Sequence, residues 1–355
     1  ASRIVGGYTI KDGVIVPNLT HSEIIEAVFS RTRVAVGLMT AAKLLSAVEP
    51  VIRYHRERYR GAAGIEAGTP RYDQGIQMKE DATQRLADVG VPDPLVDAEL
   101  LAGHILGRRR GEVQAAIVRG DGIDDAAVSA LDEAVTRRAA REPLQHITGT
   151  APFRHLELAV GPGVFVPRPE TETVVQYAID ALLSSPESAP VGIDLGTGSG
   201  AIALAMATEV PHARIFAAEL SEDAHAWASR NVAGVDNLTL VLSDLGEAFP
   251  ELDGTASVVI SNPPYVPDAA IPRDPEVRLF DPAMALYGGE DGLDIVRVLS
   301  SRALRLLRPG GLLVIEHGEL QGESIRDLLA VDGWRAPATH RDLTLRDRTT
   351  TALRP

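Results

Sequence analysis

The C-terminal half of the chain alternates between two patterns of apolar residues. Short, nearly continuous apolar runs such as Val191–Leu195 are typical of strands that are buried on both faces. The segments between these runs carry apolar residues at helical spacing. Regular alternation of the two predicts a parallel sheet with helices on both faces. The predicted strands are 191–195, 214–220, 238–242, 256–260 and 312–317, with two more near Trp334 and at 349–353, and the predicted helices are 201–208, 222–232, 293–307 and 324–329.

Upstream of this alternation, residues 79–146 show short helical patterns that are separated by Gly and Pro. They predict a small helical bundle, with helices at 82–89, 94–106, 111–119 and 124–141. A bundle of this size has little room for an active site, so we expect it to recognise the substrate. Gly and Pro also interrupt 147–172, where 153–160 and 164–166 alternate like the strands of a β-hairpin. A predicted helix at 172–183 then opens the expected catalytic domain, 173–355.

Residues 1–78 differ from the rest of the chain in composition. Residues 1–80 contain 11 Lys or Arg against 8 Asp or Glu, whereas the whole chain has a net charge of −14. The pattern indicates a short strand at Val14–Pro17 and helices between 21 and 60. We interpret 1–78 as an extension of unknown role, such as a fused segment.

Composition excludes several classes of protein. The chain has no cysteine, which rules out disulfides, thiolate zinc sites and a cysteine nucleophile. Its nine histidines show no metal-binding spacing, so no metal site is predicted. No apolar run is long enough to span a membrane, and the first residues do not show the pattern expected of a signal peptide. Because the acidic body also lacks the clustered cations that bind phosphates, we expect no direct contact with nucleic acid. The absence of cysteine and of apolar spans leads us to expect a cytoplasmic protein without membrane contacts, and we expect it to be a monomer.

Candidate chemistry begins at the end of the first predicted strand of the sheet. This strand contains Asp194 and is followed by Gly196-Thr197-Gly198-Ser199-Gly200. Glycines let a ligand approach the backbone closely, and the N–H groups at the start of the next helix point outward. With Ala201, the same residues also fit the G-x-G-x-x-A pattern of dinucleotide-binding proteins. The motif therefore predicts a nucleotide-type pocket and leaves both NAD and S-adenosylmethionine open as ligands.

Two acidic residues at later strand ends fit the same pocket. Glu219 ends the second predicted strand, where a carboxylate can accept hydrogen bonds from both hydroxyls of a ribose. Asp244 ends the third strand, where it could accept from an adenine amino group, although Asp is also a common first residue of turns. Both residues are predicted to contact the cofactor.

The second candidate motif is Asn262-Pro263-Pro264-Tyr265, at the end of the fourth predicted strand. The two prolines fix the backbone and remove two donors, so the turn presents acceptors: the Asn262 side-chain oxygen and the Pro263 carbonyl. Two acceptors held together suit an –NH₂ group, and Tyr265 adds a flat face for a planar amide or base. A hydride-transfer enzyme needs no such pair. The motif therefore favours an N-methyltransferase over an NAD-dependent oxidoreductase.

Together with Arg141-Glu142-Pro143-Leu144-Gln145, Gly149, Phe153 and Pro167–Glu172, these motifs resemble the peptide-chain release factor glutamine N5-methyltransferases over residues 80–355. The resemblance implies an α/β fold: a Rossmann-like, seven-stranded S-adenosylmethionine-dependent methyltransferase domain with an N-terminal helical bundle and a linking β-hairpin. It implies methylation of the glutamine in the Gly-Gly-Gln motif of a release factor. By position, the implied cofactor contacts are Asp194, Gly196, Thr197, Gly198, Ser199, Gly200, Glu219, Asp244, Leu245 and Asn262. The implied substrate contacts are Thr171, Asn262, Pro263, Pro264 and Tyr265, of which Asn262, Pro263 and Tyr265 are the predicted catalytic residues.

Two features depart from the family pattern, and three other functions stay open. Leu245 stands where relatives carry an aromatic residue against adenine, and residues 1–78 have no counterpart. A ribosomal-protein glutamine methyltransferase would share the Asn262–Tyr265 motif but resembles Pro167–Glu172 less. An adenine amino-methyltransferase would use the same acceptor pair but should have a basic surface. A non-catalytic binding module would leave both motifs without a purpose.

Overall fold

The computed structural model describes residues 8–11, 14–17, 70–119 and 121–355. The helices predicted between 21 and 60 lie outside these residues. The strand predicted at Val14–Pro17 is present as β2 and pairs antiparallel with β1 (Tyr8–Lys11).

The predicted helical region consists of short helices with clear start and stop signals. The Asp124 carboxylate accepts from the Ala127 N–H at 2.7 Å and opens α5, and Gly107, in the left-handed conformation, ends α3. Leu86 and Leu101 are fully buried between the helices. The bounds are α2 (Pro70–Asp88), α3 (Pro94–Leu106), α4 (Arg110–Arg119), α5 (Asp125–Ala139) and a fifth helix that was not predicted, α6 (Leu144–Thr148).

A β-hairpin is present, but the predicted strand positions were wrong. β3 (Thr150–Phe153) pairs antiparallel with β4 (Leu156–Ala159), so a turn divides the predicted strand 153–160, and 164–166 is not a strand. The turn contains Arg154 at a φ of 54°, a conformation that Gly or Asn usually signals. The apolar alternation continues across it because both strands and the following segment bury side chains in one core.

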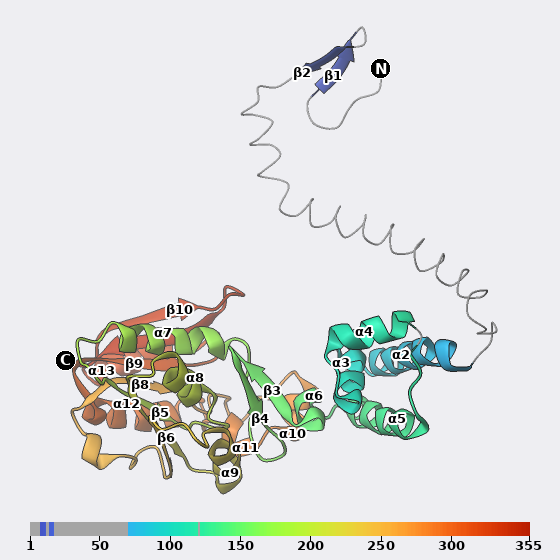
Figure 1. Cartoon of the computed structure of the whole chain (residues 1–355). Helices are drawn as coiled ribbons and strands as arrows, with labels where there is room; N and C mark the ends of the chain where they lie inside the picture. Colours follow the sequence, from blue (N-terminus) through green and yellow to red (C-terminus); the bar gives the residue numbers. More distant parts are fainter. Residues whose placement is uncertain (1–7, 12–13, 18–69, 120) are drawn as a thin grey trace. The chain divides into compact units, whose positions relative to one another are not determined.

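The hairpin leads through α7 (Thr171–Leu183) to the main sheet (Figure 1). This sheet has seven strands in the order β10-β11-β9-β8-β5-β6-β7. The five predicted central strands are parallel, but β11 is antiparallel to both neighbours, so the prediction of a wholly parallel sheet was wrong. A short turn between β10 and β11 reverses the chain, whereas parallel neighbours need a crossover. The strands are β5 (Val191–Leu195), β6 (Arg214–Glu219), β7 (Leu238–Leu242), β8 (Ala256–Ser261), β9 (Leu307–Glu316), β10 (Arg335–Arg341) and β11 (Asp347–Leu353).

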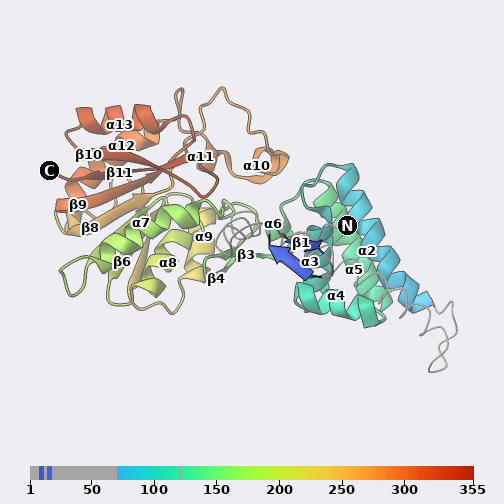
Figure 2. The same cartoon turned by 90° about the horizontal axis from the view of Figure 1, so that it is seen from above.

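Helices cover both faces of this sheet, as predicted (Figure 2). One core contains Val258, Ile260 and Val314 under α7 and α8, and the other contains Val259 and Ile315 under α12 and α13. Alternate residues of β8 and β9 therefore enter opposite cores, which gives the nearly continuous apolar runs of the sequence. The remaining bounds are α8 (Ala201–Glu209), α9 (Glu222–Asn231), η1 (Pro250–Leu252), α10 (Pro275–Phe280), α11 (Ala283–Leu286), α12 (Asp294–Leu306) and α13 (Gly322–Val331).

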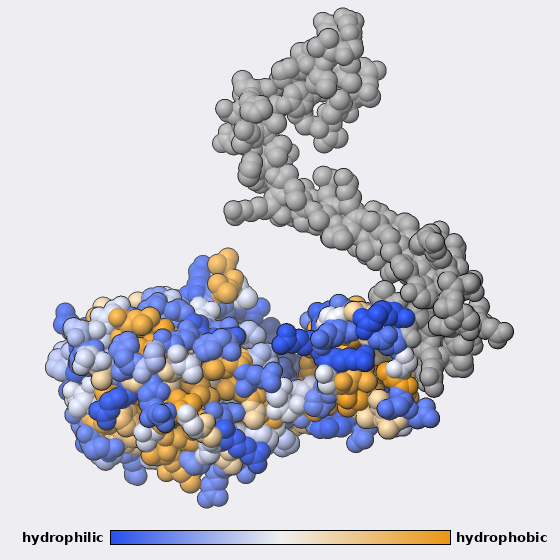
Figure 3. Space-filling view, viewed as in Figure 1, coloured by the Kyte–Doolittle hydropathy of each residue, from blue (hydrophilic) through white to orange (hydrophobic). Residues whose placement is uncertain are grey.

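Hydrophilic and apolar residues are mixed on the face of the molecule shown in Figure 3. Leu343 and Leu345, between β10 and β11, are among the most exposed apolar side chains of the described residues. No helix within the described ranges is both long and apolar enough to cross a bilayer.

Candidate active site

The two motifs meet because their strands are neighbours. β5 and β8 pair in parallel, with Asp194 opposite Ile260, so both strands end at the same edge of the sheet. The Ser261 hydroxyl donates to the Leu195 carbonyl at 2.6 Å, and both residues are fully buried. This bond joins the residue before the glycine loop to the residue before Asn262. The site therefore lies in the crevice at the carboxyl ends of the strands, where open α/β sheets bind ligands.

The glycine loop is open on the side that a ligand would approach. Gly196 and Gly198 have φ values of 77° and 59°, and a Cβ added to either would meet no atom within 4 Å. Gly200 is also left-handed, with a φ of 86°, and is the N-cap of α8. The loop thus presents bare backbone at the start of a helix, which fits a nucleotide-type cofactor.

Two buried carboxyls hold this loop in shape. Glu219 Oε2 accepts from the Gly198 N–H at 2.7 Å, and Oε1 accepts from the Leu220 and Ser221 N–H groups at 2.9 Å. Asp194 Oδ2 accepts from the Thr197 hydroxyl at 2.5 Å, whereas Oδ1 is buried without a partner. Burial raises the pKa of Asp194 to about 7, against the Thr197 hydrogen bond, which lowers it.

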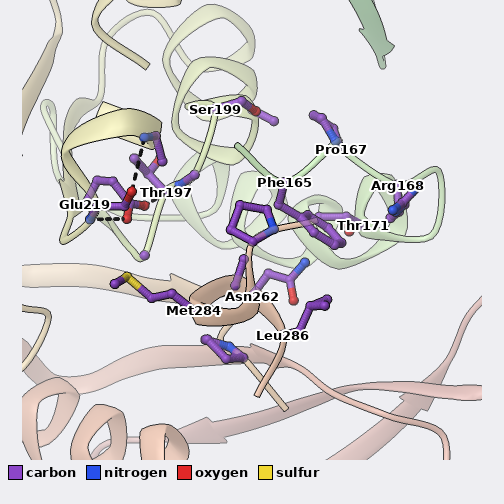
Figure 4. A pocket seen from close by; sticks show the side chains of 18 of the residues that line it. Phe165, Pro167, Arg168, Thr171, Thr197, Ser199, Glu219, Asn262, Met284 and Leu286 are labelled. Carbon is purple, nitrogen blue, oxygen red and sulfur yellow. Dashed lines mark hydrogen bonds between the residues drawn. The ribbon is translucent and has the colours of Figure 1, made fainter. Parts of the chain in front are cut away.

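A cavity of about 280 Å³ lies between the glycine loop and the second motif (Figure 4). Its lining includes most of the predicted site residues: Thr171, Gly196, Thr197, Gly198, Ser199, Glu219, Asn262, Pro264 and Tyr265. Residues from two motifs about sixty positions apart and from the start of α7 thus face one cavity. A ligand held by the glycine loop would lie beside Asn262.

The second motif forms a firm wall of this cavity. The backbone at Tyr265 is held in place, because its carbonyl accepts a hydrogen bond from Gln321 Nε2 at 2.9 Å. Burial raises the pKa of Tyr265, so its phenol stays neutral at physiological pH. Pro263 is buried and does not line the cavity with the others. Its predicted role, through its carbonyl, stays a prediction.

Several lining residues were not predicted. Phe165 and Arg168 come from the segment between the hairpin and α7, and Met284 and Leu286 come from α11 (Figure 4). Arg168 Nη2 lies 2.6 Å from Asp281 Oδ2, and burial raises the pKa of Asp281 to about 6 despite this cation. Phe165 belonged only to the predicted hairpin strand 164–166, and no motif marked Met284 or Leu286 as site residues. Arg168 lies in the Pro167–Glu172 stretch that carried the family resemblance.

Other predicted cofactor contacts do not line the cavity. Asp194 lies beneath the loop, and Gly200 faces α9. Asp244 Oδ1 accepts from the Gly246 N–H at 2.7 Å, as expected of a turn residue, and the half-buried Leu245 packs against the α12 core. Their contacts with an adenine ring stay predictions. Within the described residues, no group of three or more His, Asp or Glu is placed to hold a metal ion.

Comparison with known proteins agrees with this arrangement. A model of the PrmC N-terminal domain matches residues 77–149, and a model of the methyltransferase small domain matches 158–296. A release factor glutamine methyltransferase of Streptomyces coelicolor is 52% identical over 76% of this chain and 95% of its own. A 4-amino-L-phenylalanine/4-methylamino-L-phenylalanine methyltransferase of Streptomyces pristinaespiralis is 37% identical over 78% of this chain and 94% of its own.

Among solved structures, a release factor-specific protein-(glutamine-N5) methyltransferase of Alicyclobacillus acidocaldarius is 26% identical, with a TM-score of 0.35, over 55% of this chain and 98% of that one. The family models together match more than half of the chain, and the Streptomyces coelicolor relative is matched over nearly its whole length. The chain therefore belongs to the family of release factor glutamine methyltransferases.

Proposed function

We propose that this protein transfers a methyl group from S-adenosylmethionine to the side-chain nitrogen of the glutamine in the Gly-Gly-Gln motif of a release factor, acting as a monomer in the cytoplasm. The observation that carries the proposal is the shared cavity, which has a glycine loop on one side and Asn262, Pro264 and Tyr265 on the other. Family membership supports the choice of a methyl donor and of a glutamine substrate.

The loop fits the cofactor through its own chemistry. Gly196 and Gly198 leave open space for the ligand. Glu219 Oε2 accepts one N–H group of the loop, from Gly198, and Oε1 accepts two from the residues after Glu219, so a lone pair on Oε2 can still accept from a ribose hydroxyl. When bound, the cofactor supplies an electrophilic methyl group on a sulfonium.

The second motif provides what an amide nucleophile needs. An amide nitrogen is a poor nucleophile because its lone pair is delocalised into the carbonyl. In the proposed mechanism, Asn262 Oδ1 and the Pro263 carbonyl each accept one N–H bond and turn the nitrogen lone pair toward the methyl group. The N–C bond forms as the S–C bond breaks, and positive charge grows on nitrogen beside these two oxygens. One of the two protons then leaves nitrogen for water, which completes the secondary amide.

The test is incubation with isotopically labelled S-adenosylmethionine and a purified release factor, followed by mass analysis of the Gly-Gly-Gln peptide. We expect one labelled methyl group on the glutamine, and none when that glutamine is replaced by alanine. Label on ribosomal protein, DNA or RNA instead of the release factor would overturn the proposal.

A second candidate substrate is a free aromatic amine. One relative is named for 4-amino-L-phenylalanine, and an aryl –NH₂ group also offers two donors to the acceptor pair. The same assay with 4-amino-L-phenylalanine separates the candidates by kcat/KM. A higher value for the amino acid than for the release factor would favour this second substrate.

A further inference from the structure

One buried carboxyl beside the cavity has no part in the mechanism above. Glu316 is the last residue of β9 and is 1% exposed. β8 and β9 pair in parallel with Ser261 opposite Ile315, so the next residue of each strand, Asn262 and Glu316, lie side by side. On its other side, Glu316 pairs with Thr349 of β11.

Glu316 and Asn262 also point to the same side of the sheet. Val314 and Ile260 both belong to the core under α7 and α8, whereas Ile315 belongs to the opposite core. Since side chains alternate along a strand, Glu316 and Asn262 are both directed toward the start of α7. Thr171, the first residue of α7, lies there and lines the cavity with Asn262 (Figure 4).

The surroundings of Glu316 leave its charge poorly compensated. The Thr171 hydroxyl and the Asn262 amide are the hydrogen-bonding side chains that face the carboxyl, and Arg348, Glu170 and Tyr265 are the charged or titratable groups around it. Glu316 Oε2 has no hydrogen-bond partner of good geometry among the described residues. The guanidinium of Arg348 contacts other groups: its Nε lies 3.7 Å from Asp342 Oδ2, and its Nη1 donates to the His317 carbonyl at 3.2 Å.

Such a carboxyl lowers the free energy of unfolding. Burial raises the pKa of Glu316 to about 7, against the nearby Thr171 hydroxyl and the charge of Arg348. A buried acid without an ion pair destabilises the folded state, and a Gln of the same shape would avoid that cost. A purely structural acceptor for Thr171 does not need a charge. The charge lies beside the residue that would hold the reacting nitrogen, which gives it a use in catalysis.

We propose that Glu316 is a positioning residue: its carboxylate accepts an N–H bond from the Asn262 amide, so that Asn262 Oδ1 is the atom presented to the substrate nitrogen. Without this acceptor the Asn262 amide could turn over and offer N–H groups, which would repel the donors of the substrate. The negative charge of Glu316 also favours the positive charge that grows on the nitrogen. This inference rests on the proposed function for its catalytic consequence, but the orientation of Asn262 does not depend on any substrate.

The test compares Glu316→Gln with wild type and with Glu99→Gln. Glu99 is 3% exposed and belongs to α3, so its variant removes a buried carboxyl away from the cavity. Because a Gln amide can donate as well as accept, it no longer fixes which way the Asn262 amide faces. With a release factor as substrate, we therefore expect Glu316→Gln to lower kcat about 10- to 100-fold. The dissociation constant of S-adenosylmethionine and KM for the release factor should stay within about twofold of wild type, and Glu99→Gln should keep the wild-type kcat.

Two further readouts separate positioning from structural support. In the double variant with Asn262→Ala, the loss should equal that of Asn262→Ala alone, because both changes act on one contact. The wild-type kcat should rise with pH through about 7 as Glu316 ionises, and Glu316→Gln should lack this limb. Asp194 also has a pKa raised to about 7, so a limb that persists in Glu316→Gln belongs to Asp194 and contradicts the proposal.

A measurement without substrate keeps this inference distinct from the proposed function. In protein labelled with ¹⁵N at asparagine, the Asn262 side-chain –NH₂ signal, assigned from Asn262→Ala, should titrate near pH 7 in wild type and not in Glu316→Gln. A signal that does not titrate in wild type, a wild-type kcat in Glu316→Gln, or additive losses in the double variant would each overturn the inference. If wild type fails to methylate a release factor, the proposed function fails, and the –NH₂ signal still decides the contact.

Discussion

The Ser261 hydroxyl donates to the Leu195 carbonyl at 2.6 Å, across two neighbouring strands and in a fully buried position. Each residue directly precedes one of the two motifs that face the cavity. Replacing Ser261 by Ala leaves the Leu195 carbonyl without this donor, and we expect a loss of about 1–3 kcal/mol in the free energy of unfolding. Because the motifs would also lose their link, kcat/KM should fall about tenfold or more. Denaturant titration and steady-state kinetics measure the two effects.

Ser257→Ala is the matched control for this change. Ser257 lies in the same strand at the opposite end and donates to Glu187 Oε2 at 3.0 Å. Its loss should change the free energy of unfolding but not kcat/KM. Equal kinetic effects of the two variants would show that the link at Ser261 has no special role.

Glu219 is expected to determine cofactor affinity. In wild type the Glu219 carboxylate accepts hydrogen bonds from the backbone N–H groups of Gly198, Leu220 and Ser221. Glu219→Gln replaces one of its oxygens with an amide –NH₂ group, which would face a backbone N–H group, either at Gly198 or at Leu220 and Ser221. A hydrogen bond to a charged group contributes about 1.5–3 kcal/mol, so the dissociation constant of S-adenosylmethionine should rise about 10- to 100-fold. Calorimetry measures this constant. Glu222→Gln, at an exposed position in the first turn of α9, is the control and should bind as wild type does.

Asn262→Ala should separate cofactor binding from turnover. Losing one preorganised polar partner costs about 3 kcal/mol in the transition state, so kcat should fall about 100-fold while the cofactor dissociation constant changes only a few-fold. Asn237→Ala is a suitable control, because Asn237 Nδ2 donates to the Ala207 and Ala213 carbonyls outside the cavity. That variant should lower the melting temperature and keep kcat. Parallel losses of binding and turnover in Asn262→Ala would contradict the assigned role.

Asp194 should make the stability of the ligand-free protein fall as pH rises. Burial raises its pKa from 3.8 to about 7 in the folded state, so the stability it contributes is complete below pH 3.8 and is lost as pH rises through 7. Between pH 5.5 and 8.5, wild type should lose up to about 2 kcal/mol more free energy of unfolding than Asp194→Asn. Glu316 titrates in both proteins and cancels in the comparison. Parallel pH profiles of the two proteins would contradict the assignment.

Glu276 links α10 to the helical region and should be important for stability. Its two carboxylate oxygens lie 2.7 Å from Arg138 Nη1 and 2.6 Å from Arg141 Nη2, in a nearly buried network that also contains Asp97. Removing one partner leaves buried charge without compensation, so Glu276→Ala should cost about 3–5 kcal/mol in the free energy of unfolding. Glu323→Ala, on the exposed surface of α13, is the control.

Because of the same network, the free energy of unfolding should depend on pH in the acid range. Burial raises the pKa of Glu276, but hydrogen bonds with Asp274, Arg141 and Arg138 outweigh it and lower the pKa to about 2. This stabilisation is present above the ordinary pKa of 4.5 and is lost as pH falls toward 2. Wild type should therefore lose stability more steeply than Glu276→Gln between pH 4.5 and 2. Similar slopes would show that the ion pairs contribute little.

The central sheet and the two main motifs could be predicted from the sequence because their signals are local. Val191–Leu195 is apolar throughout, and glycines follow it directly, so strand, turn and ligand loop are all specified within ten residues. In the structure β5 pairs with β8, which brings the two motifs to the same edge of the sheet.

Other features depend on contacts between distant residues. The direction of β11 follows from pairing with β9, and the turn at Arg154 is held by bonds to the α7 residues Glu172 and Gln176. Met284 and Leu286 line the cavity because of the way the segment after Tyr265 folds. Glu316 lies beside Asn262 because β9 pairs with β8. No local pattern encodes such neighbours, so the sequence alone could not identify them.

The ion pairs at Glu276 limit how freely this enzyme can be recombined with its relatives. α10 leads directly into α11, which contributes Met284 and Leu286 to the cavity, while the cations that neutralise Glu276 come from α5 and the turn after it. In a chimera that takes only the helical segment from a relative, Glu276 and the cavity wall would come from this protein. The two guanidinium groups that pair with Glu276 would have to come from the relative. Such exchanges should yield working enzymes only when the incoming segment supplies both arginines, so substrate range and fold would have to be engineered together.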